Sequence, residues 1–171
     1  DWETQRDCDL YIGYINADES LLRHLYFGSP HASYRRRILS LVDDQLDLPA
    51  SHIWSLGGSG ESARIFDAQS GQLELGKSLE PGRLMHQMMI LLCSDFYRPV
   101  SIGSAFSELF AGEHFAQQGS ANRVSQVVRR LRHWLQQERL GVAIVEQGGK
   151  YRLQGISGSD FGVRVPLVMP E

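Results

Sequence analysis

One segment near the C-terminal end gathers the side chains best suited to binding chemistry. Between Gly119 and Leu140 the sequence carries five arginines and a single glutamate. We expect a helix that Ser120 caps and that runs to about Glu138, with its apolar residues on one face at about 100° per residue. The apolar residues are Val124, Val127, Val128, Leu131, Trp134 and Leu135. This helix should pack along one stripe and leave its other face to solvent.

The other face of this helix is polar and basic. It presents Asn122, Ser125, Gln126, Arg129 and His133, with Arg130 and Arg132 on its two flanks. A helix enters the major groove of B-DNA, where arginine bridges guanine edges and asparagine or glutamine bridges adenine. On this interpretation Asn122, Gln126 and Arg129 face base edges. Arg123 and Arg130, nearer the packed face, hold phosphates.

An ordinary surface helix with solvated arginines has the same pattern, so the neighbouring segments matter. Residues 142–146 and 150–153 flank Gln147-Gly148-Gly149, a sequence that tolerates positive φ and predicts a β-hairpin. A short helix with Ser101 or Ser104 as its cap precedes the basic helix. These neighbours favour the binding interpretation.

Two short strands and a helix are predicted upstream of these elements. Residues 63–67 and 72–75 predict two short strands joined by a turn. Pro81-Gly82 then opens an apolar helix, whose methionines are expected to fill the core. The order of strands, three helices and hairpin predicts the α+β class and a winged helix-turn-helix.

The remaining sequence forms an acidic first block and a tail. Residues 1–60 carry helix signals, including an Asp18 cap and a Ser29-Pro30 start, and the Gly-rich stretch 56–62 predicts a flexible boundary. In the tail, 156–171, alternating valines suit an edge strand with no assigned partner. We therefore expect a helical segment 1–60 that docks or dimerises, a winged-helix domain 61–155 and a tail.

Three segments resemble the effector domain of the OmpR/PhoB-type winged helix-turn-helix family. The segment 123–135, Arg-Val-Ser-Gln-Val-Val-Arg-Arg-Leu-Arg-His-Trp-Leu, is similar to its recognition helix, 66–75 to its strand pair and 148–153 to its wing. The likeness covers residues 63–153. It implies transcriptional regulation by DNA binding, with Arg129, Arg130 and Arg132 at basic recognition positions. It also implies that the loop 111–119 lies where the family touches RNA polymerase.

The sequence departs from the family pattern in two places. Gln147, preceded by Glu146, stands where a wing arginine is expected, and an acidic group there repels phosphate. The wing contact would then be weaker or would shift to Lys150. Residues 1–60 do not resemble a receiver domain, which argues against control by aspartyl phosphorylation within this chain.

The sequence does not indicate catalytic or metal chemistry. No two of the six histidines stand at metal-ligand spacing on one helix face, and Gly57-Gly-Ser-Gly60 lacks the Lys-Ser/Thr of a P-loop. There is no GxSxG, and Cys93 lies in an apolar run without a histidine partner. We therefore expect no enzyme activity and no cofactor.

Charge and composition set further limits. The net charge is −3, but residues 1–63 hold 5 basic and 10 acidic residues, whereas residues 64–155 hold 11 basic and 8 acidic ones. DNA responds to the local patch rather than to the average. Two cysteines make no disulfide framework, and no apolar run is long enough to span a bilayer, so a reducing, cytoplasmic environment is expected.

The sequence thus predicts a bacterial-type transcription regulator, or the DNA-binding part of a larger one, that binds double-stranded DNA. The predicted contact residues are Asn122, Arg123, Gln126, Arg129, Arg130, Arg132, His133 and Lys150. RNA polymerase, through the loop 111–119, and a second copy of the chain are further expected partners. A winged helix that binds proteins and no DNA is one alternative, which the acidic first block and Glu146 favour. In another, the first block covers the recognition helix and inhibits it.

Overall fold

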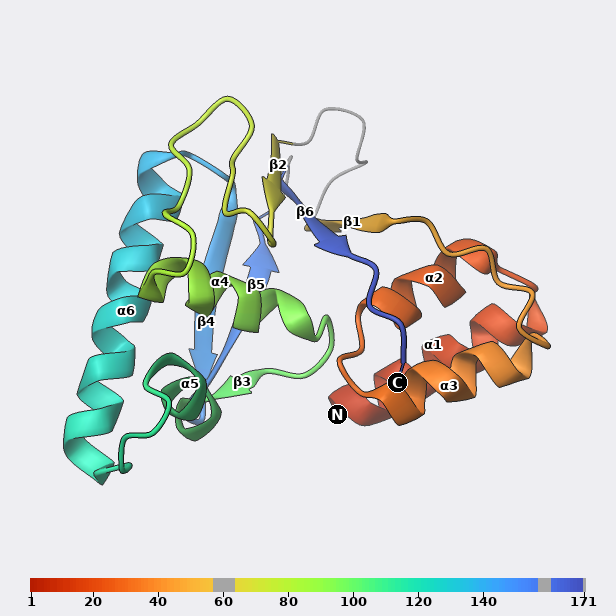
Figure 1. The fold of residues 1–171 in the computed structure, drawn as a ribbon, viewed down its shortest axis with the longest axis horizontal. Helices are drawn as coiled ribbons and strands as arrows, with labels where there is room; N and C mark the ends of the chain where they lie inside the picture. The colour runs from red at the N-terminus through yellow and green to blue at the C-terminus, as the bar shows by residue number, and fades with distance from the viewer. Residues whose placement is uncertain (57–63, 157–160, 171) are drawn as a thin grey trace.

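The computed structural model describes residues 1–56, 64–156 and 161–170, and over these residues the fold is of the α+β class. Six helices accompany two three-stranded sheets. Figure 1 shows the first three helices grouped at one end and the longest helix, α6, at the other. Residues 57–62 of the predicted Gly-rich boundary lie outside the described residues.

The first block begins with three helices, α1 (Trp2–Ile15), α2 (Glu19–Phe27) and α3 (Ala32–Leu41). The predicted cap is confirmed, because the Asp18 side chain accepts a hydrogen bond from Leu21 N at 3.0 Å. The predicted Ser29-Pro30 start is wrong by two residues. His31 is the N-cap residue of α3 and makes no side-chain capping bond, while Ser29 is buried.

Strands from the first block and the tail form a sheet with the strand that precedes α4. β1 (Ser51–Leu56), β6 (Phe161–Pro166) and β2 (Arg64–Asp67) lie in the order β1-β6-β2, with β1 antiparallel and β2 parallel to β6. Two expectations need correction: the first block is not helical throughout, and the tail supplies a central strand rather than an edge strand. Val163 is fully buried because Trp54 and Phe66 pair with it from the two sides.

The predicted strand pair 63–67 and 72–75 forms only in part. β2 is a strand, but its second partner reduces to one antiparallel bridge between Phe66 and Leu73. The turn between them holds Gly71 at φ +75° and a capping Asp67 side chain, whose Oδ1 accepts from Ser70 N at 2.8 Å. The chain then leaves the sheet, because Arg64 binds the backbone carbonyls of residues 74 and 75.

The second half of the chain runs α4 (Leu84–Ser94), β3 (Val100–Ser101), α5 (Ile102–Leu109), α6 (Gln117–Gln137), β4 (Val142–Gln147) and β5 (Lys150–Gly155). The last sheet has the order β3-β5-β4, all antiparallel. Ser101 caps α5, as predicted. α6 starts four residues earlier than predicted, with Ala116 as its N-cap residue, and Ser120 instead accepts a hydrogen bond from Ala116 N at 2.8 Å.

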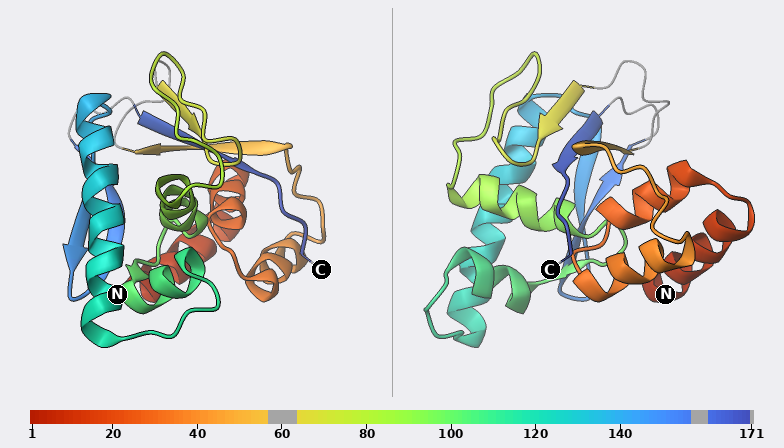
Figure 2. Two further views of the ribbon diagram at one scale, coloured as in Figure 1. Left: turned by 60° about the vertical axis from the view of Figure 1, so that its left-hand side comes forward. Right: turned by 45° about the vertical axis from the view of Figure 1, so that its right-hand side comes forward.

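The β4–β5 hairpin is confirmed. Gly148 and Gly149, the two loop residues, have φ of +58° and +72°, which a two-residue turn of type I′ requires. Figure 2 shows α6 running beside this hairpin, and α6 packs on α4, α5 and β4. The predicted methionine packing is also confirmed, since Met88 and Met89 are fully buried in α4.

A cluster of aromatic rings and histidines joins the helical block to the rest of the molecule. The Phe96 ring stacks on Trp54 at 4.3 Å and lies 4.9 Å from His24. His52 stacks on Phe27, and its Nε2 is 3.4 Å from His24 Nδ1. Burial lowers the pKa of His52 to about 4 and also lowers the pKa of His24.

We expect this cluster to make stability depend on pH. Both histidines are held neutral in the fold, so the unfolded chain binds more protons below pH about 6.5. Stability present above that pH is lost as the pH falls toward 4. Asp9 opposes the effect at His24, and Arg23 strengthens it at His52.

Urea unfolding at pH 7.5 and at pH 5 measures this loss. His52→Phe keeps the ring stack but removes the titrating group. Its free energy of unfolding should therefore fall less between pH 7.5 and pH 5 than that of the wild type, by on the order of 1 kcal/mol. His133→Phe, at an exposed position, is the control. Equal losses in the wild type and in His52→Phe would contradict the assignment.

Candidate nucleic-acid interface

α6 is amphipathic in the way that the periodicity predicts. The six apolar residues of its inner face are all at most 4% exposed. The seven predicted contact residues on α6 are all exposed, and the helix contains four arginines and no acidic residue. The outer face is therefore basic between Arg123 and Arg132.

The two halves of the outer face differ in chemistry. Asn122 and Gln126 lie in the N-terminal half and offer amide groups. Arg129, Arg130 and His133 lie in the C-terminal half, where they line a groove together with residues 77–85. Amide and guanidinium groups on one exposed helix face have the donors that base edges require.

Arg132 has a second role that the sequence did not reveal. Its Nε and Nη2 donate to the Ile144 carbonyl oxygen at 3.1 and 2.9 Å. This bond ties α6 to β4, and on the same flank the Ser125 hydroxyl lies 3.4 Å from the Tyr151 hydroxyl. Arg132 therefore links the helix to the hairpin, and its Nη1 forms no hydrogen bond with any described residue.

Arg123 is engaged with the loop that precedes α6. Its guanidinium donates to both carboxylate oxygens of Glu113 and lies 3.8 Å from the centre of the Phe110 ring. The hydrogen bond from Arg123 lowers the pKa of Glu113. The predicted phosphate contact of Arg123 thus competes with an existing exposed ion pair.

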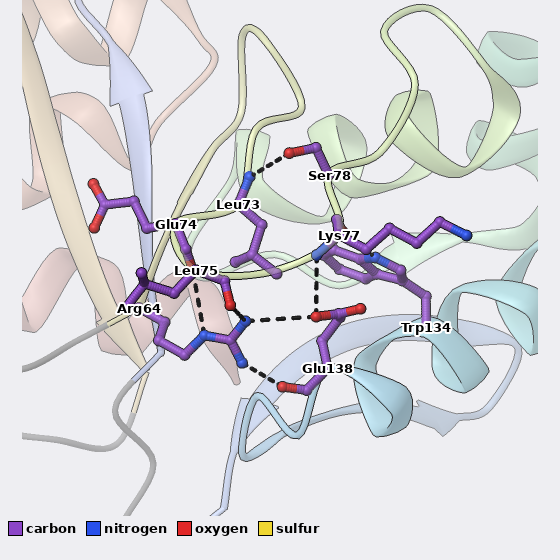
Figure 3. Close-up of polar contacts among 8 residues, drawn as sticks. All are labelled: Arg64, Leu73, Glu74, Leu75, Lys77, Ser78, Trp134 and Glu138. Carbon is purple, nitrogen blue, oxygen red and sulfur yellow. Dashed lines mark hydrogen bonds and ion pairs between the residues drawn. The ribbon is translucent and has the colours of Figure 1, made fainter.

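A network of polar contacts fixes the C-terminal end of α6 (Figure 3). Arg64 donates to the carbonyl oxygen of Glu138 and to that of Leu75, the latter at 2.9 Å, and Arg64 Nη2 is 3.5 Å from Glu138 Oε2. The same carboxylate accepts from Lys77 N at 3.1 Å, and Trp134 Nε1 donates to the Lys77 carbonyl at 2.8 Å. The segment 74–77 is thereby held against the helix.

The hairpin presents cations on its outer face. Lys150, the predicted wing contact, is exposed, and so is Arg152, two residues along the same strand face. Glu146 is paired with Tyr151 and belongs to the other face. Alternation along β5 could have identified Arg152 as a second wing cation, which the sequence analysis omitted.

Two further cations come from outside the predicted interface. Lys77 and Arg83 precede α4, yet they line the groove beside Arg129 and Arg130. Their place depends on the loop that Arg64 and Trp134 hold, so no pattern in the local sequence indicates it. The basic surface is consequently wider than α6 alone.

The part of the chain that the structure describes also bears on other kinds of site. There, no group of three or more histidine, cysteine, aspartate or glutamate side chains is arranged to hold a metal ion. Within the same residues, no helix has both the length and the apolar character needed to cross a bilayer. No known protein family, curated protein or solved structure matches the chain.

Proposed function

We propose that this chain is a bacterial-type, cytoplasmic transcription regulator, or the DNA-binding part of one, that places α6 in the major groove of double-stranded DNA and acts without catalysis. The observation that carries the proposal is the outer face of α6 from Asn122 to His133, which is exposed and basic and contains no acidic residue. Affinity for DNA comes mainly from such local cationic surface.

The arrangement around α6 supports a winged helix-turn-helix. α4, α5 and α6 are followed by a two-stranded hairpin, and β3 adds a third strand to that hairpin. In this architecture the last helix enters the major groove while the hairpin reaches the neighbouring backbone. Because Arg132 ties β4 to α6, the two elements would meet the duplex as one rigid unit.

The side chains divide into three roles on this proposal. Asn122, Gln126 and Arg129 read base edges, because they lie on the outermost face. Arg130, Arg132 and His133 contact the phosphates on the flanks, and Lys150 with Arg152 contacts them from the wing. Arg123 mainly holds the loop through Glu113, so its removal should cost less affinity than that of Arg129.

The loop 111–116 offers a second surface for RNA polymerase. Glu113, His114 and Phe115 are exposed there, and the Phe115 ring packs edge-on against Phe106 at 5.4 Å. The Arg123–Glu113 pair would hold this surface in a fixed position relative to bound DNA.

Fluorescence anisotropy with a random-sequence duplex, titrated from about 50 to 200 mM salt, tests the proposal. Neutralising four or five phosphates predicts a slope of log K against log salt of about −4. With a selected operator as the duplex, Arg129→Ala should weaken the free energy of binding by about 1 to 3 kcal/mol, and Arg123→Ala should weaken it less.

The matched control is Arg36→Ala, which removes one exposed arginine from α3 and should leave the affinity unchanged. Absence of binding at low salt would overturn the proposal and favour the alternative, a protein-binding winged helix. Binding that Arg129→Ala and Arg36→Ala weaken equally would show that net charge, and not α6, is responsible.

A further inference from the structure

A groove runs along the C-terminal half of α6, and residues 77–85 form its other wall. We call it the α6 groove. It encloses about 900 Å³, which is large enough for several side chains. Its floor is apolar: Leu84 and Met85 are half-buried, and only the edges of Leu79 and Trp134 are exposed. A duplex offers little apolar surface to fill such a floor.

The rim of the α6 groove is basic. Lys77, Arg129 and Arg130 line it and form no ion pair with any described residue. Arg83 also lines it, but its charge is offset by Glu80, at 3.1 Å. An apolar floor within a cationic rim is complementary to an acidic, amphipathic segment.

The helical block carries a surface of that kind on α1. Cys8, Tyr11, Ile12 and Ile15 follow the spacing i, i+3, i+4 and i+7, which places them on one face of the helix. Tyr11, Ile12 and Ile15 are 52%, 49% and 77% exposed. A contiguous exposed apolar stripe of this size marks an interaction surface.

The surroundings of this stripe are acidic. Residues 1–19 contain six acidic residues and one basic residue, Arg6. Arg6 is turned inward, with its guanidinium 4.1 Å from the centre of the Tyr34 ring. Arg37 of α3 pairs with Asp7 at 3.5 Å and donates to the Tyr11 hydroxyl at 3.2 Å, and Glu3 lies on the opposite face of α1. Asp18, three residues beyond Ile15, is exposed and forms no ion pair with any described residue.

We propose that α1 of a second copy of the chain docks in the α6 groove, with Ile12 and Ile15 on Met85 and with Asp18 against Arg129 and Arg130. A second copy is required, because α1 and α6 lie at opposite ends of the molecule (Figure 1). The contact joins two different surfaces. If each of two copies places its α1 in the groove of the other, a closed dimer forms; if not, each copy binds the next and an open chain of copies forms.

Docked α1 would cover the arginines assigned to DNA, so self-association and DNA binding would exclude each other. This consequence rests on the proposed function, whereas the docking itself does not. At high protein concentration the DNA-binding face of α6 would then be covered by a second copy. Dilution, or competition by DNA, would expose it.

Sedimentation equilibrium over a range of protein and salt concentrations tests the docking. Ile12→Lys and Met85→Glu should each weaken self-association at least about 10-fold, and added salt should weaken it in the wild type. Ile156→Lys alters a 54% exposed isoleucine outside both surfaces and should have no effect. A monomer at every concentration, or association that neither Ile12→Lys nor Met85→Glu weakens, would overturn the proposal.

Thiol cross-linking identifies the surfaces that meet. Cys8 is exposed on the stripe and Cys93 is buried, so Met85→Cys adds one reactive partner. We expect a link between Cys8 of one chain and the thiol that Met85→Cys introduces in another, detected by mixing isotopically light and heavy chains. A link between two copies of Cys8 alone would overturn the proposal.

The same variants separate the docking from the proposed function. Ile12→Lys should bind DNA more tightly than the wild type at high protein concentration, because the arginines of α6 are then uncovered. If neither protein binds DNA while the link to the introduced thiol still forms, the proposed function fails and the docking stands.

Discussion

Replacing Arg129 and Arg130 together by glutamate is expected to weaken duplex binding more than 100-fold at low salt. Each substitution removes a cation that contacts DNA and brings a carboxylate toward the phosphates. The two charge reversals together are expected to weaken the free energy of binding to DNA by at least about 3 kcal/mol. Both side chains are exposed and form no ion pair with any described residue, so the free energy of unfolding should hardly change. The slope of log K against log salt should become shallower by about 1, because Arg130 is the phosphate contact of the two.

The control is Arg36→Glu with Arg37→Glu, which makes the same change of net charge on an adjacent, exposed pair in α3 and also breaks the Arg37–Asp7 ion pair. Titrations at equal salt compare the two double variants with the wild type. The α6 variant should lose nearly all binding and the α3 variant little, because fields on exposed surfaces are screened within about 10 Å. Equal losses would place the DNA contact outside α6.

The face that these substitutions address could be predicted because it depends on local sequence alone. The apolar spacing from Val124 to Leu135 sets the side of the helix that packs, and the exposed side follows from it. The hairpin could be predicted for the same reason, since Gly148 and Gly149 supply positive φ next to each other. Such signals need no knowledge of the partner element.

Contacts between distant segments could not be predicted. β6 has an alternating pattern, but nothing in the tail shows that β1 and β2 flank it and bury Val163. Likewise, Arg132 and Arg129 have similar neighbours in the sequence. Only the approach of β4 decides that Arg132 binds the Ile144 carbonyl while Arg129 remains exposed.

Arg64 shows how such a distant contact can decide both stability and the shape of the site. Arg64→Ala is expected to lower the free energy of unfolding by about 2 to 4 kcal/mol, because it leaves the Glu138 and Leu75 carbonyls and the Glu138 carboxylate short of a partner. For a chain of this length, Tm should fall by about 5 to 12 °C. Arg83→Ala breaks an exposed ion pair and should cost less than about 0.5 kcal/mol.

Gly76 makes the prediction specific to this network. A Cβ at Gly76 would lie 2.2 Å from Arg64 Nη2 and 2.6 Å from Glu138 Oε2, so Gly76→Ala should destabilise the wild type. In the Arg64→Ala background the Arg64 side chain no longer obstructs this Cβ. Gly76→Ala should therefore lower the free energy of unfolding by about 1 kcal/mol less than in the wild type. Urea unfolding of the four proteins measures this coupling. Strictly additive changes in the free energy of unfolding would mean that the segment 74–77 is held by the bonds of Lys77 to Trp134 and Glu138 rather than by Arg64.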